Sequence, residues 1–302
     1  MEIREIEENE LQTLVRIARA AQPREQASVG DFVDWRRQAG EMVWLLCEHD
    51  GSALGAGFAL TGWHTPPHRA IGAVLVEPEA RRAGTGTAVL QALEAWARAR
   101  GATELEGPVQ EDDAGSLAWT ERRGYAEAGR DSHLVLDLAA IDAPEPDPPP
   151  GIEIVTWADR PELTAGLYEV AIEATPDIPG AEEDELGSLE EWLERDMGGA
   201  GDDPRAVFVA LAGDEVTGFA KFSLSSGNRE RAFHDLTGVR RAWRGRGIAA
   251  ALKRTQIAWA KHEGYTSLQT SNEARNEPIR RLNARHGYVV EPGSVIVRRV
   301  LP

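Results

Sequence analysis

The sequence contains very little cysteine and lysine. Cys47 is its single cysteine, which excludes an internal disulfide, and its place in the apolar run 42–47 predicts a small buried hydrophobic side chain. Lysine occurs only at positions 221, 253 and 261, so nearly all of the 33 basic residues are arginines. This bias is typical of genes rich in G and C, and we assign it no function.

Long apolar stretches and an excess of basic residues are missing as well. No run approaches the roughly 18 apolar residues that span a membrane, and residues 1–5 lack the basic and apolar regions of a signal peptide. We therefore expect a cytoplasmic protein without a membrane partner. Acidic residues outnumber basic ones by 50 to 33, for a net charge of −17. This charge argues against nucleic acid as a partner, because phosphates require a basic surface.

Length and composition indicate two globular domains. The chain has 302 residues, and domains average about 150. With 42% hydrophobic and 27% charged residues, it has enough apolar side chains for a packed core. A proline-rich stretch at 142–150 predicts a stiff linker, because proline fixes φ and has no N–H to donate. We expect an N-terminal domain over 1–141 and a C-terminal domain over 151–302.

The two halves repeat each other at a constant spacing of 163 positions. The matching pairs are Val76 and Val239, Arg81 and Arg244, Gly84 and Gly247, Ala88 and Ala251, Trp96 and Trp259, Gly101 and Gly264, Leu105 and Leu268, Gly124 and Gly287, and Tyr125 and Tyr288. Such gapless matches indicate a duplicated fold. In each half the patterns predict the order strand, helix, helix, three strands, helix, strand, helix, strand, with hairpins at 50–51 and 213–214.

A basic, glycine-containing turn before a helix lies at the centre of each copy. Residues 81–86 and 244–249 form these turns. A helix N-terminus offers unpaired N–H groups and a positive dipole, so a phosphate or pyrophosphate fits there. The spacing excludes a Walker loop, which needs Gly-Lys-Ser/Thr, and residues 84–89 lack the third glycine of a dinucleotide fingerprint. A plain basic turn that joins strand to helix is the alternative.

These residues resemble the GNAT N-acetyltransferase superfamily. Both turns fit its Arg/Gln-x-x-Gly-x-Gly/Ala signature, and both copies carry its later Gly-Tyr pair, at 124–125 and 287–288. The paired arrangement is similar to that of tandem GNAT proteins. The resemblance implies the α/β (α+β) class, with two tandem domains that each have a mixed, largely antiparallel twisted sheet flanked by helices. It also implies an acyltransferase that uses acetyl-CoA as co-substrate, without a metal.

The resemblance further implies which residues hold the cofactor. In the second copy, these are Val239, Arg244, Gly245, Arg246, Gly247, Ile248, Ala249 and Asn276; in the first copy, they are Val76, Arg81, Arg82, Ala83, Gly84, Thr85 and Gly86. The turns would bind the pyrophosphate through backbone N–H groups. Val239 would pair with the pantetheine arm and polarise the acetyl carbonyl. Asn276 would contact the arm, unless it is a helix cap or an ordinary loop residue.

Differences between the copies favour the second as the catalytic one. Period-two alternation in the strand 233–239 would put Asp235, Thr237 and Val239 on one face, whereas the position equivalent to Asp235 is Gly72. An amine acceptor is protonated at neutral pH, so transfer needs a base, and Asp235 is our candidate. A solvated or structurally bonded aspartate is the plainer alternative. By this comparison the first copy is degenerate or structural.

One family feature is missing, and the acceptor is defined only as a class. Many members place an acidic tyrosine four residues before the final glycine, where this chain has Thr120 and Asn283. A thiol with a pKa near about 8.5 is a good leaving group, so this loss weakens the mechanism without excluding it. We expect the amine of a small molecule as acceptor, lined by residues 173–180 and the acidic run 182–185. The alternatives are a non-catalytic CoA-binding scaffold and a peptide or protein N-acetyltransferase.

Overall fold

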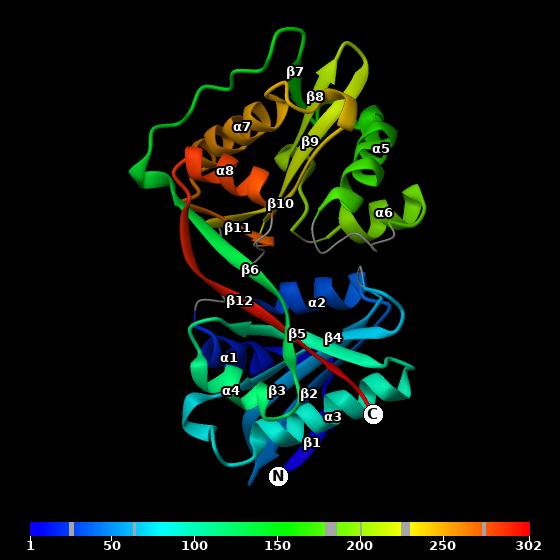
Figure 1. Cartoon of the computed structure of the whole chain (residues 1–302), viewed down its shortest axis with the longest axis vertical. Helices are drawn as coiled ribbons and strands as arrows, with labels where there is room; N and C mark the ends of the chain where they lie inside the picture. The colour runs from blue at the N-terminus through cyan, green and yellow to red at the C-terminus, as the bar shows by residue number, and fades with distance from the viewer. Residues whose placement is uncertain (24–26, 63–64, 179–185, 200, 225–229, 274–275) are drawn as a thin grey trace. The chain divides into compact units, whose positions relative to one another are not determined.

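A computed structural model describes residues 1–23, 27–62, 65–178, 186–199, 201–224, 230–273 and 276–302. The chain divides into two compact units, Met1–Arg130 with Ser294–Pro302, and Asp131–Gly293 (Figure 1). The predicted order of elements is confirmed in both copies, and so are both hairpins. In the described part, none of the helices has the length and apolar character needed to cross a bilayer.

Unit 1 contains the elements of the first copy. They are β1 (Glu2–Glu5), α1 (Leu11–Ala21), α2 (Val29–Gln38), β2 (Glu41–His49), β3 (Ser52–Thr61), β4 (Arg69–Val76), α3 (Thr85–Ala99), β5 (Glu104–Gln110), α4 (Ala114–Glu121) and the start of β6 (Ala126–Asp137). Its strand order is β1-β2-β3-β4-β5-β12. Neighbouring strands are antiparallel except β4 and β5, which are parallel.

Unit 2 repeats this arrangement. Its elements are β7 (Glu153–Thr156), α5 (Thr164–Ala174), α6 (Leu189–Asp196), β8 (Val207–Ala212), β9 (Glu215–Leu224), β10 (Arg231–Val239), α7 (Ile248–His262), β11 (Ser267–Glu273), α8 (Glu277–Arg285) and the start of β12 (Val289–Val300). Its strand order is β6-β11-β10-β9-β8-β7, with β10 and β11 parallel. The predicted fold class, two tandem domains with largely antiparallel sheets flanked by helices, is confirmed.

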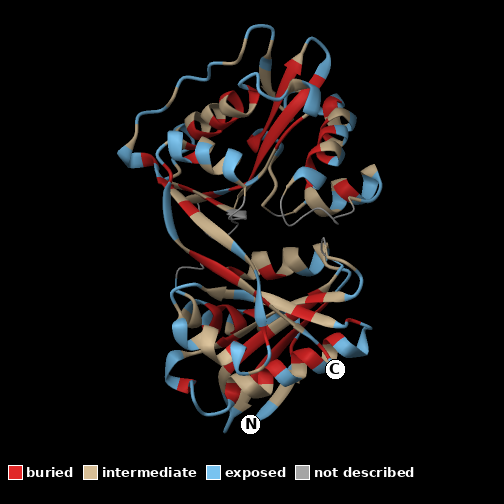
Figure 2. Ribbon diagram, viewed as in Figure 1, coloured by how far each residue is buried: buried red, intermediate tan, exposed pale blue. Residues whose placement is uncertain are grey.

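Each sheet buries both of its faces. In unit 1, Leu93 of α3 packs on one face and Phe32 of α2 on the other. In unit 2, Leu252 of α7 and Trp192 of α6 cover the corresponding faces. Figure 2 shows the buried residues on the central strands and on the helix sides turned toward them. Cys47 is fully buried, as its apolar run predicts, and burial raises the pKa of its thiol.

The boundaries of the units differ from the predicted domain boundaries, because the copies exchange their last strands. Residues 131–137 of β6 pair with β11 in unit 2, and residues 294–300 of β12 pair with β5 in unit 1. The proline-rich segment 142–150 therefore lies within unit 2 and not between the domains. There, the guanidinium of Arg254 in α7 donates to the carbonyl of Asp147 at 2.7 Å.

The exchanged end of β12 supports unit 1 through a buried charge. Arg299 lies 2.8 Å from the carboxylate of Glu94, which also accepts a hydrogen bond of 3.0 Å from Tyr125. We expect Arg299→Ala to lower the free energy of unfolding of unit 1 by about 2–3 kcal/mol, because it removes the nearer counter-charge of a buried carboxylate and leaves only the more distant Arg98, at 3.9 Å. Urea denaturation measures this loss. Arg130→Ala, which breaks an exposed pair with Glu127, is the control and should cost less than about 1 kcal/mol.

Candidate functional site

A similar backbone turn precedes the central helix of each copy. Gly84 and Gly247 stand directly before α3 and α7, with φ of 92° and 89°, a left-handed conformation that favours glycine. Two residues earlier, Arg82 and Gly245 also have positive φ, 67° and 74°. The first N–H groups of a helix lack intrahelical partners and lie at the positive end of its dipole. Both turns therefore have the geometry that binds an anion through the backbone.

The remaining predicted turn residues surround these glycines. They are Arg81, Ala83, Thr85 and Gly86 in the first copy and Arg244, Arg246, Ile248 and Ala249 in the second. The side chains of Thr85 and Ile248 face the core, since each residue is only 1% exposed. These two side chains are therefore not available to a ligand at the turn.

The central parallel strands separate in both copies. The ladder between β4 and β5 contains three pairs and ends at Ile71 and Glu106, although β4 continues to Val76 and β5 to Gln110. The ladder between β10 and β11 also has three pairs. Beyond these pairs, backbone groups that would join two strands are available to a ligand lying between them.

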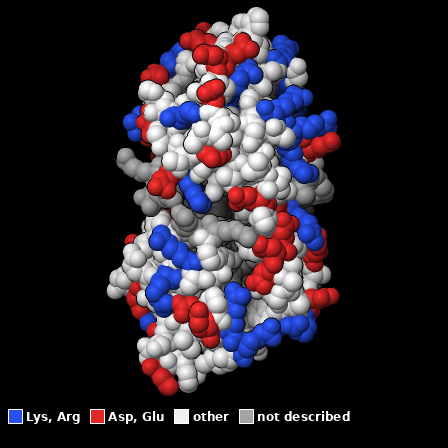
Figure 3. Space-filling view, turned by 90° about the vertical axis from the view of Figure 1, so that its left-hand side faces the viewer, with Lys and Arg blue, Asp and Glu red and all other residues white. Residues whose placement is uncertain are grey.

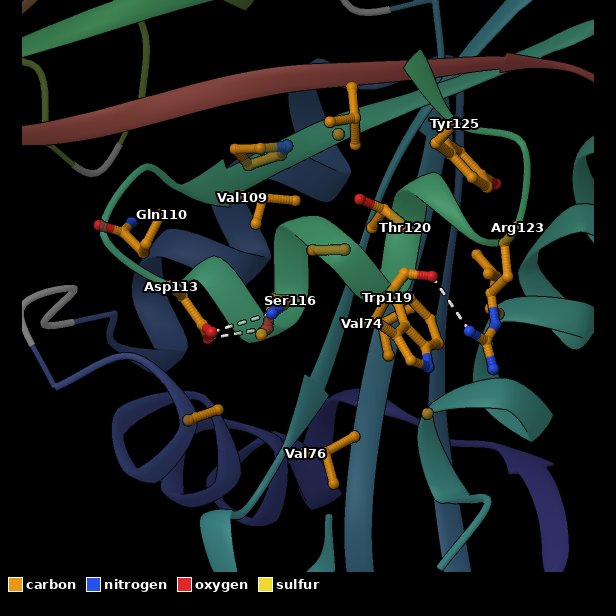
Figure 4. Close-up of a pocket in the computed structure, with 18 of the residues that line it drawn as sticks. Val74, Val76, Val109, Gln110, Asp113, Ser116, Trp119, Thr120, Arg123 and Tyr125 are labelled. Atoms are coloured by element: carbon orange, nitrogen blue, oxygen red, sulfur yellow. Dashed lines mark hydrogen bonds between the residues drawn. The ribbon is translucent and has the colours of Figure 1, made fainter. Parts of the chain in front are cut away.

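In unit 1 this separation opens into a cavity of about 680 Å³. β4, β5, α3 and α4 surround it, and the turn before α3 closes one end (Figure 4). Val74, Leu90 and Leu93 give it apolar walls, and Gln22 and Pro23 line it from the segment after α1. Its volume lies within the range usual for sites of small molecules and cofactors. Val297 of the exchanged strand β12 also lines it.

The turn end of this cavity is basic. Arg81, Arg82, Arg122 and Arg123 all line it. Arg123 donates to the hydroxyl of Thr87 at 2.6 Å, and its guanidinium lies 4.1 Å from the ring centre of Trp119. This arrangement favours an anionic group near the N-terminus of α3. By contrast, acidic and basic side chains lie interspersed over the face shown in Figure 3.

Asp113 and Asn276 occupy equivalent positions, yet they behave differently. Asp113 caps α4, accepting from the Ser116 N–H at 2.9 Å, and it lies 3.6 Å from Arg81. Although burial opposes it, the hydrogen bonds from Ser116 lower the pKa of Asp113. Asn276 precedes α8, but its side chain does not cap the helix. The helix-cap alternative for Asn276 is therefore wrong, and the predicted cofactor contact stays open.

In the second copy, carboxylates of α5 and the segment after it hold the arginines around the turn. Asp177 bonds to Arg241 at 2.8 Å and to Arg244 at 2.7 Å. Glu173 accepts from the backbone N–H of Arg241. The hydrogen bonds from both guanidinium groups hold the pKa of Asp177 well below its usual range. Asp177 thus neutralises part of the positive charge that the turn offers. The acidic run 182–185 predicted to line the acceptor lies outside the described residues.

The predicted placement of Asp235 beside Thr237 and Val239 is wrong. A β-bulge in β10 between His234 and Thr237 interrupts the alternation of side chains. Asp235 lies on the face of α6, 2.9 Å from Lys221, whereas Val239 packs on the opposite face with α7. The carbonyl of Val239 accepts from the guanidinium of Arg244 at 2.9 Å.

Lys221 is the centre of this charged group. It is 5% exposed and contacts Asp202 at 2.8 Å as well as Asp235. Although burial opposes it, the charges of Asp235 and Asp202 raise the pKa of Lys221. A carboxylate that already receives an ammonium hydrogen bond has less capacity to take a proton from an amine.

We expect Lys221→Met to lower the free energy of unfolding of unit 2 by about 3–4 kcal/mol, because it leaves the carboxylate of Asp202, of which only 10% is exposed, without a counter-charge. Urea denaturation followed by tryptophan fluorescence measures the change. Adding Asp202→Leu to the variant should restore part of the loss. An unchanged unfolding transition in the single variant contradicts the structural role given to this pair.

A buried polar cluster lies on the opposite face of β10, and its members Gln256, Tyr288 and Lys253 were not among the predicted site residues. His234 is 3% exposed and bonds through Nδ1 to Gln256 at 3.0 Å and through Nε2 to the hydroxyl of Tyr288. Lys253, 1% exposed, lies with its ammonium 5.5 Å from the centre of the Tyr288 ring. Burial lowers the pKa of His234 well below its usual range. Comparing residues 163 positions apart could have revealed this cluster, because the first copy has apolar residues at most of these positions.

The equivalent positions in the first copy are mainly apolar. Leu90, Leu93 and Ile71 stand where the second copy has Lys253, Gln256 and His234, and Tyr125 corresponds to Tyr288. Leu90, Leu93 and Tyr125 all line the cavity of unit 1. The two copies thus share a backbone plan, but the side chains at these equivalent positions differ in polarity.

Comparisons with known proteins agree with this geometry. The family model described as Acetyltransferase (GNAT) family matches residues 3–125 and 165–288. An Aminoglycoside N(6')-acetyltransferase type 1 from Klebsiella aerogenes is 29% identical over 110 residues, which are 35% of this chain and 72% of that protein. The chain belongs to the GNAT family of acetyltransferases. The predicted class, an acyltransferase, is confirmed by this membership.

Solved structures repeat the fold of the whole chain. A GCN5-related N-acetyltransferase from Sphaerobacter thermophilus has a TM-score of 0.78 at 23% identity, covering 100% of this chain and 96% of that one. A tandem GNAT protein from the clavulanic acid biosynthesis pathway has a TM-score of 0.81 at 20% identity, with coverage of 100% and 98%. At these identities the likeness concerns the fold, and it confirms the tandem arrangement.

Proposed function

We propose that the chain transfers an acetyl group from acetyl-CoA to the amine of a small molecule, and that the cavity of unit 1 binds the cofactor. The main support for this proposal is the cavity of unit 1. It joins an anion-binding turn to a slot between separated strands, and therefore suits a ligand with phosphates at one end and a narrow, uncharged arm. The backbone of residues 81–86 would bind the pyrophosphate, and Arg82 and Arg122 would add charge. Val76 ends the strand along which the arm would lie.

The first copy thereby binds the cofactor, whereas the sequence comparison predicts a degenerate or structural role for it. The turn, the separated strands and an apolar-walled cavity occur together there, and these features support cofactor binding by the copy expected to be degenerate. In the second copy, residues 244–249, Val239 and Asn276 remain a predicted second cofactor site. Asp177 pairs with two arginines there, at 2.8 Å and 2.7 Å, whereas Asp113 lies 3.6 Å from a single arginine in the first copy. We therefore expect weaker binding in the second copy.

A small-molecule amine is the proposed acceptor. The relative from Klebsiella aerogenes is named for N-acetylation of an aminoglycoside, which supports an amine acceptor in this class. In unit 1, Gln22, Pro23 and Glu106 line the cavity in addition to the residues of the turn. An amine entering there would attack the thioester carbonyl, lose a proton and release CoA as a thiol.

Calorimetric titration with acetyl-CoA, followed by a thiol-release assay against a panel of amines, tests this function. We expect saturable binding and CoA release that depends on a small amine such as an aminosugar. Release with peptides alone would favour the peptide N-acetyltransferase alternative. Binding without any acceptor-dependent release would favour the scaffold, and the absence of binding would overturn the proposal.

Asp235 stays the predicted base for the second copy. If turnover takes place in the second copy and Asp235 deprotonates the acceptor there, Asp235→Ala should lower kcat by about 100-fold or more, with little change in KM for acetyl-CoA. Turnover in unit 1 alone should leave kcat unchanged. Steady-state kinetics separate these parameters. Thr156→Ala, which removes an exposed hydroxyl bonded to Asp159, serves as the control. An unchanged rate in Asp235→Ala removes Asp235 from the mechanism.

A further inference from the structure

Lys253 differs from the other two lysines of the chain in having neither a hydrogen-bond nor an ion-pair partner among the residues that the structure describes. Lys221 lies between Asp202 and Asp235, and Lys261 donates to the carbonyls of Leu138, at 2.7 Å, and Ile141. Lys253 is 1% exposed, and burial is the single influence on its pKa within the described structure. Its ammonium lies 5.5 Å from the centre of the Tyr288 ring.

The position of Lys253 corresponds to a cavity wall in the first copy. α3 and α7 both have 15 residues and follow left-handed glycines with nearly the same φ. Leu90, at the position of Lys253, lines the cavity of unit 1, as does Tyr125, at the position of Tyr288. A cofactor arm between β10 and β11 would therefore pass the amine of Lys253.

The surroundings of Lys253 also point to a space that receives a polar group. Gln256, one helical turn further along α7, is fully buried, and within the described residues its amide nitrogen Nε2 has no hydrogen-bond partner. A buried amide donor left unpaired costs free energy, and a bound acceptor atom removes that cost. The carbonyl oxygens of a pantetheine arm and of an acetyl group are such acceptors.

We propose that Lys253 is a site of acetylation by the chain's own acetyl-CoA, bound in the second copy; this rests on the proposed use of acetyl-CoA. The Nζ lone pair attacks the thioester carbonyl, a C–N bond forms and the C–S bond breaks. Nζ gives up one proton, which the departing thiolate takes, so the products are Nε-acetyllysine and CoA. The modification replaces a basic amine with a neutral amide in the wall of this space.

The ionisation of Lys253 supports this assignment. Burial lowers its pKa to about 7, so near neutral pH a large fraction of the amine carries the free lone pair that acylation requires. A lysine with an ordinary pKa is uncharged in only about one molecule per thousand at that pH. The groups facing Lys253 are His234 of β10, Tyr288 before β12 and His286 after α8, and all of them lack negative charge at neutral pH.

Mass spectrometry of the full chain after incubation with acetyl-CoA at pH 7.5 tests the proposal. We expect one added acetyl group, mapped to the peptide with Lys253 and at least about 100-fold above the level on Lys221 or Lys261. Lys253→Arg should remove it. Gly247→Glu, which places a carboxylate at the turn of the second copy, should also remove it, whereas Gly84→Glu should leave it in place.

The possible failures are distinguishable. If calorimetry detects acetyl-CoA binding and amines are acetylated while Lys253 stays unmodified, this inference alone is overturned. If acetyl-CoA does not bind at all, the proposed function fails with it. Acetylation of Lys253 that survives in Gly247→Glu also overturns the proposal, because it shows that the acetyl group does not come from cofactor held at that turn.

Discussion

Gly84→Glu is expected to weaken acetyl-CoA binding to unit 1 by roughly 100-fold or more, because it introduces a negative charge at the N-terminus of α3. Gly84 lines the cavity and has φ of 92°, so any side chain there is also strained. The carboxylate would face the position proposed for the pyrophosphate. Isothermal titration calorimetry measures both the affinity and the number of sites.

Two matched variants separate charge at the turn from backbone strain. Gly101, just beyond the other end of α3, has φ of 82° and open space around its Cα, so Gly101→Glu imposes similar strain far from the turn. Gly247→Glu makes the same change in the second copy, where φ is 89°. If Gly84→Glu binds as tightly as Gly101→Glu, or if Gly247→Glu alone loses the strong site, the cofactor is not held in unit 1 as proposed.

Lys253→Leu is expected to stabilise unit 2 by on the order of 4 kcal/mol at pH 7, because each unit of pKa depression costs about 1.4 kcal/mol. Burial lowers the pKa of Lys253 from 10.5 to about 7. Between these values, the unfolded chain binds a proton that the folded chain does not, so stability rises with pH across this window. Below about pH 7 both states are protonated, and the full cost of burying the charge is present.

Urea denaturation at several pH values between 6 and 10 measures this effect. The wild-type chain should gain stability over that window, and Lys253→Leu should lose most of the gain while being more stable at the low end. Leucine is already the residue at position 90, the equivalent site of unit 1, so its shape fits the shared fold. Lys253→Gln, which removes the charge but keeps a polar end, is the control. Equal pH dependence in both proteins would contradict a depressed pKa.

Much of the fold could be predicted from local patterns. Alternation and helical periodicity predicted the order of elements in both copies, and the spacing of 163 predicted the duplication. The turns before α3 and α7 were also predictable, since glycine is favoured where φ is positive. These features depend on residues that are neighbours in the chain, so the sequence contains the information directly.

Other features depend on pairings that local patterns leave open. The bulge at His234 to Thr237 reverses which face Asp235 occupies, and no residue type in the strand signals it. Likewise, His234 and Lys253 looked like ordinary strand and helix residues, and only packing showed that they are buried together. The charge partner of Asp235 is Lys221 of β9, which also binds Asp202 from the segment after α6.

The sequence by itself determined the family, the duplicated plan and the two anion-binding turns of this protein. The tertiary structure decided which strand completes each sheet: β12 pairs with β5, and β6 pairs with β11. The sequence leaves this open, because β5 and β11 are equivalent strands and offer similar edges. The tertiary structure also decided that the cavity of unit 1 is walled by apolar side chains and closed partly by the C-terminal strand. Backbone propensities are local, whereas cavities and partner choice arise from side chains that meet only after the chain has folded.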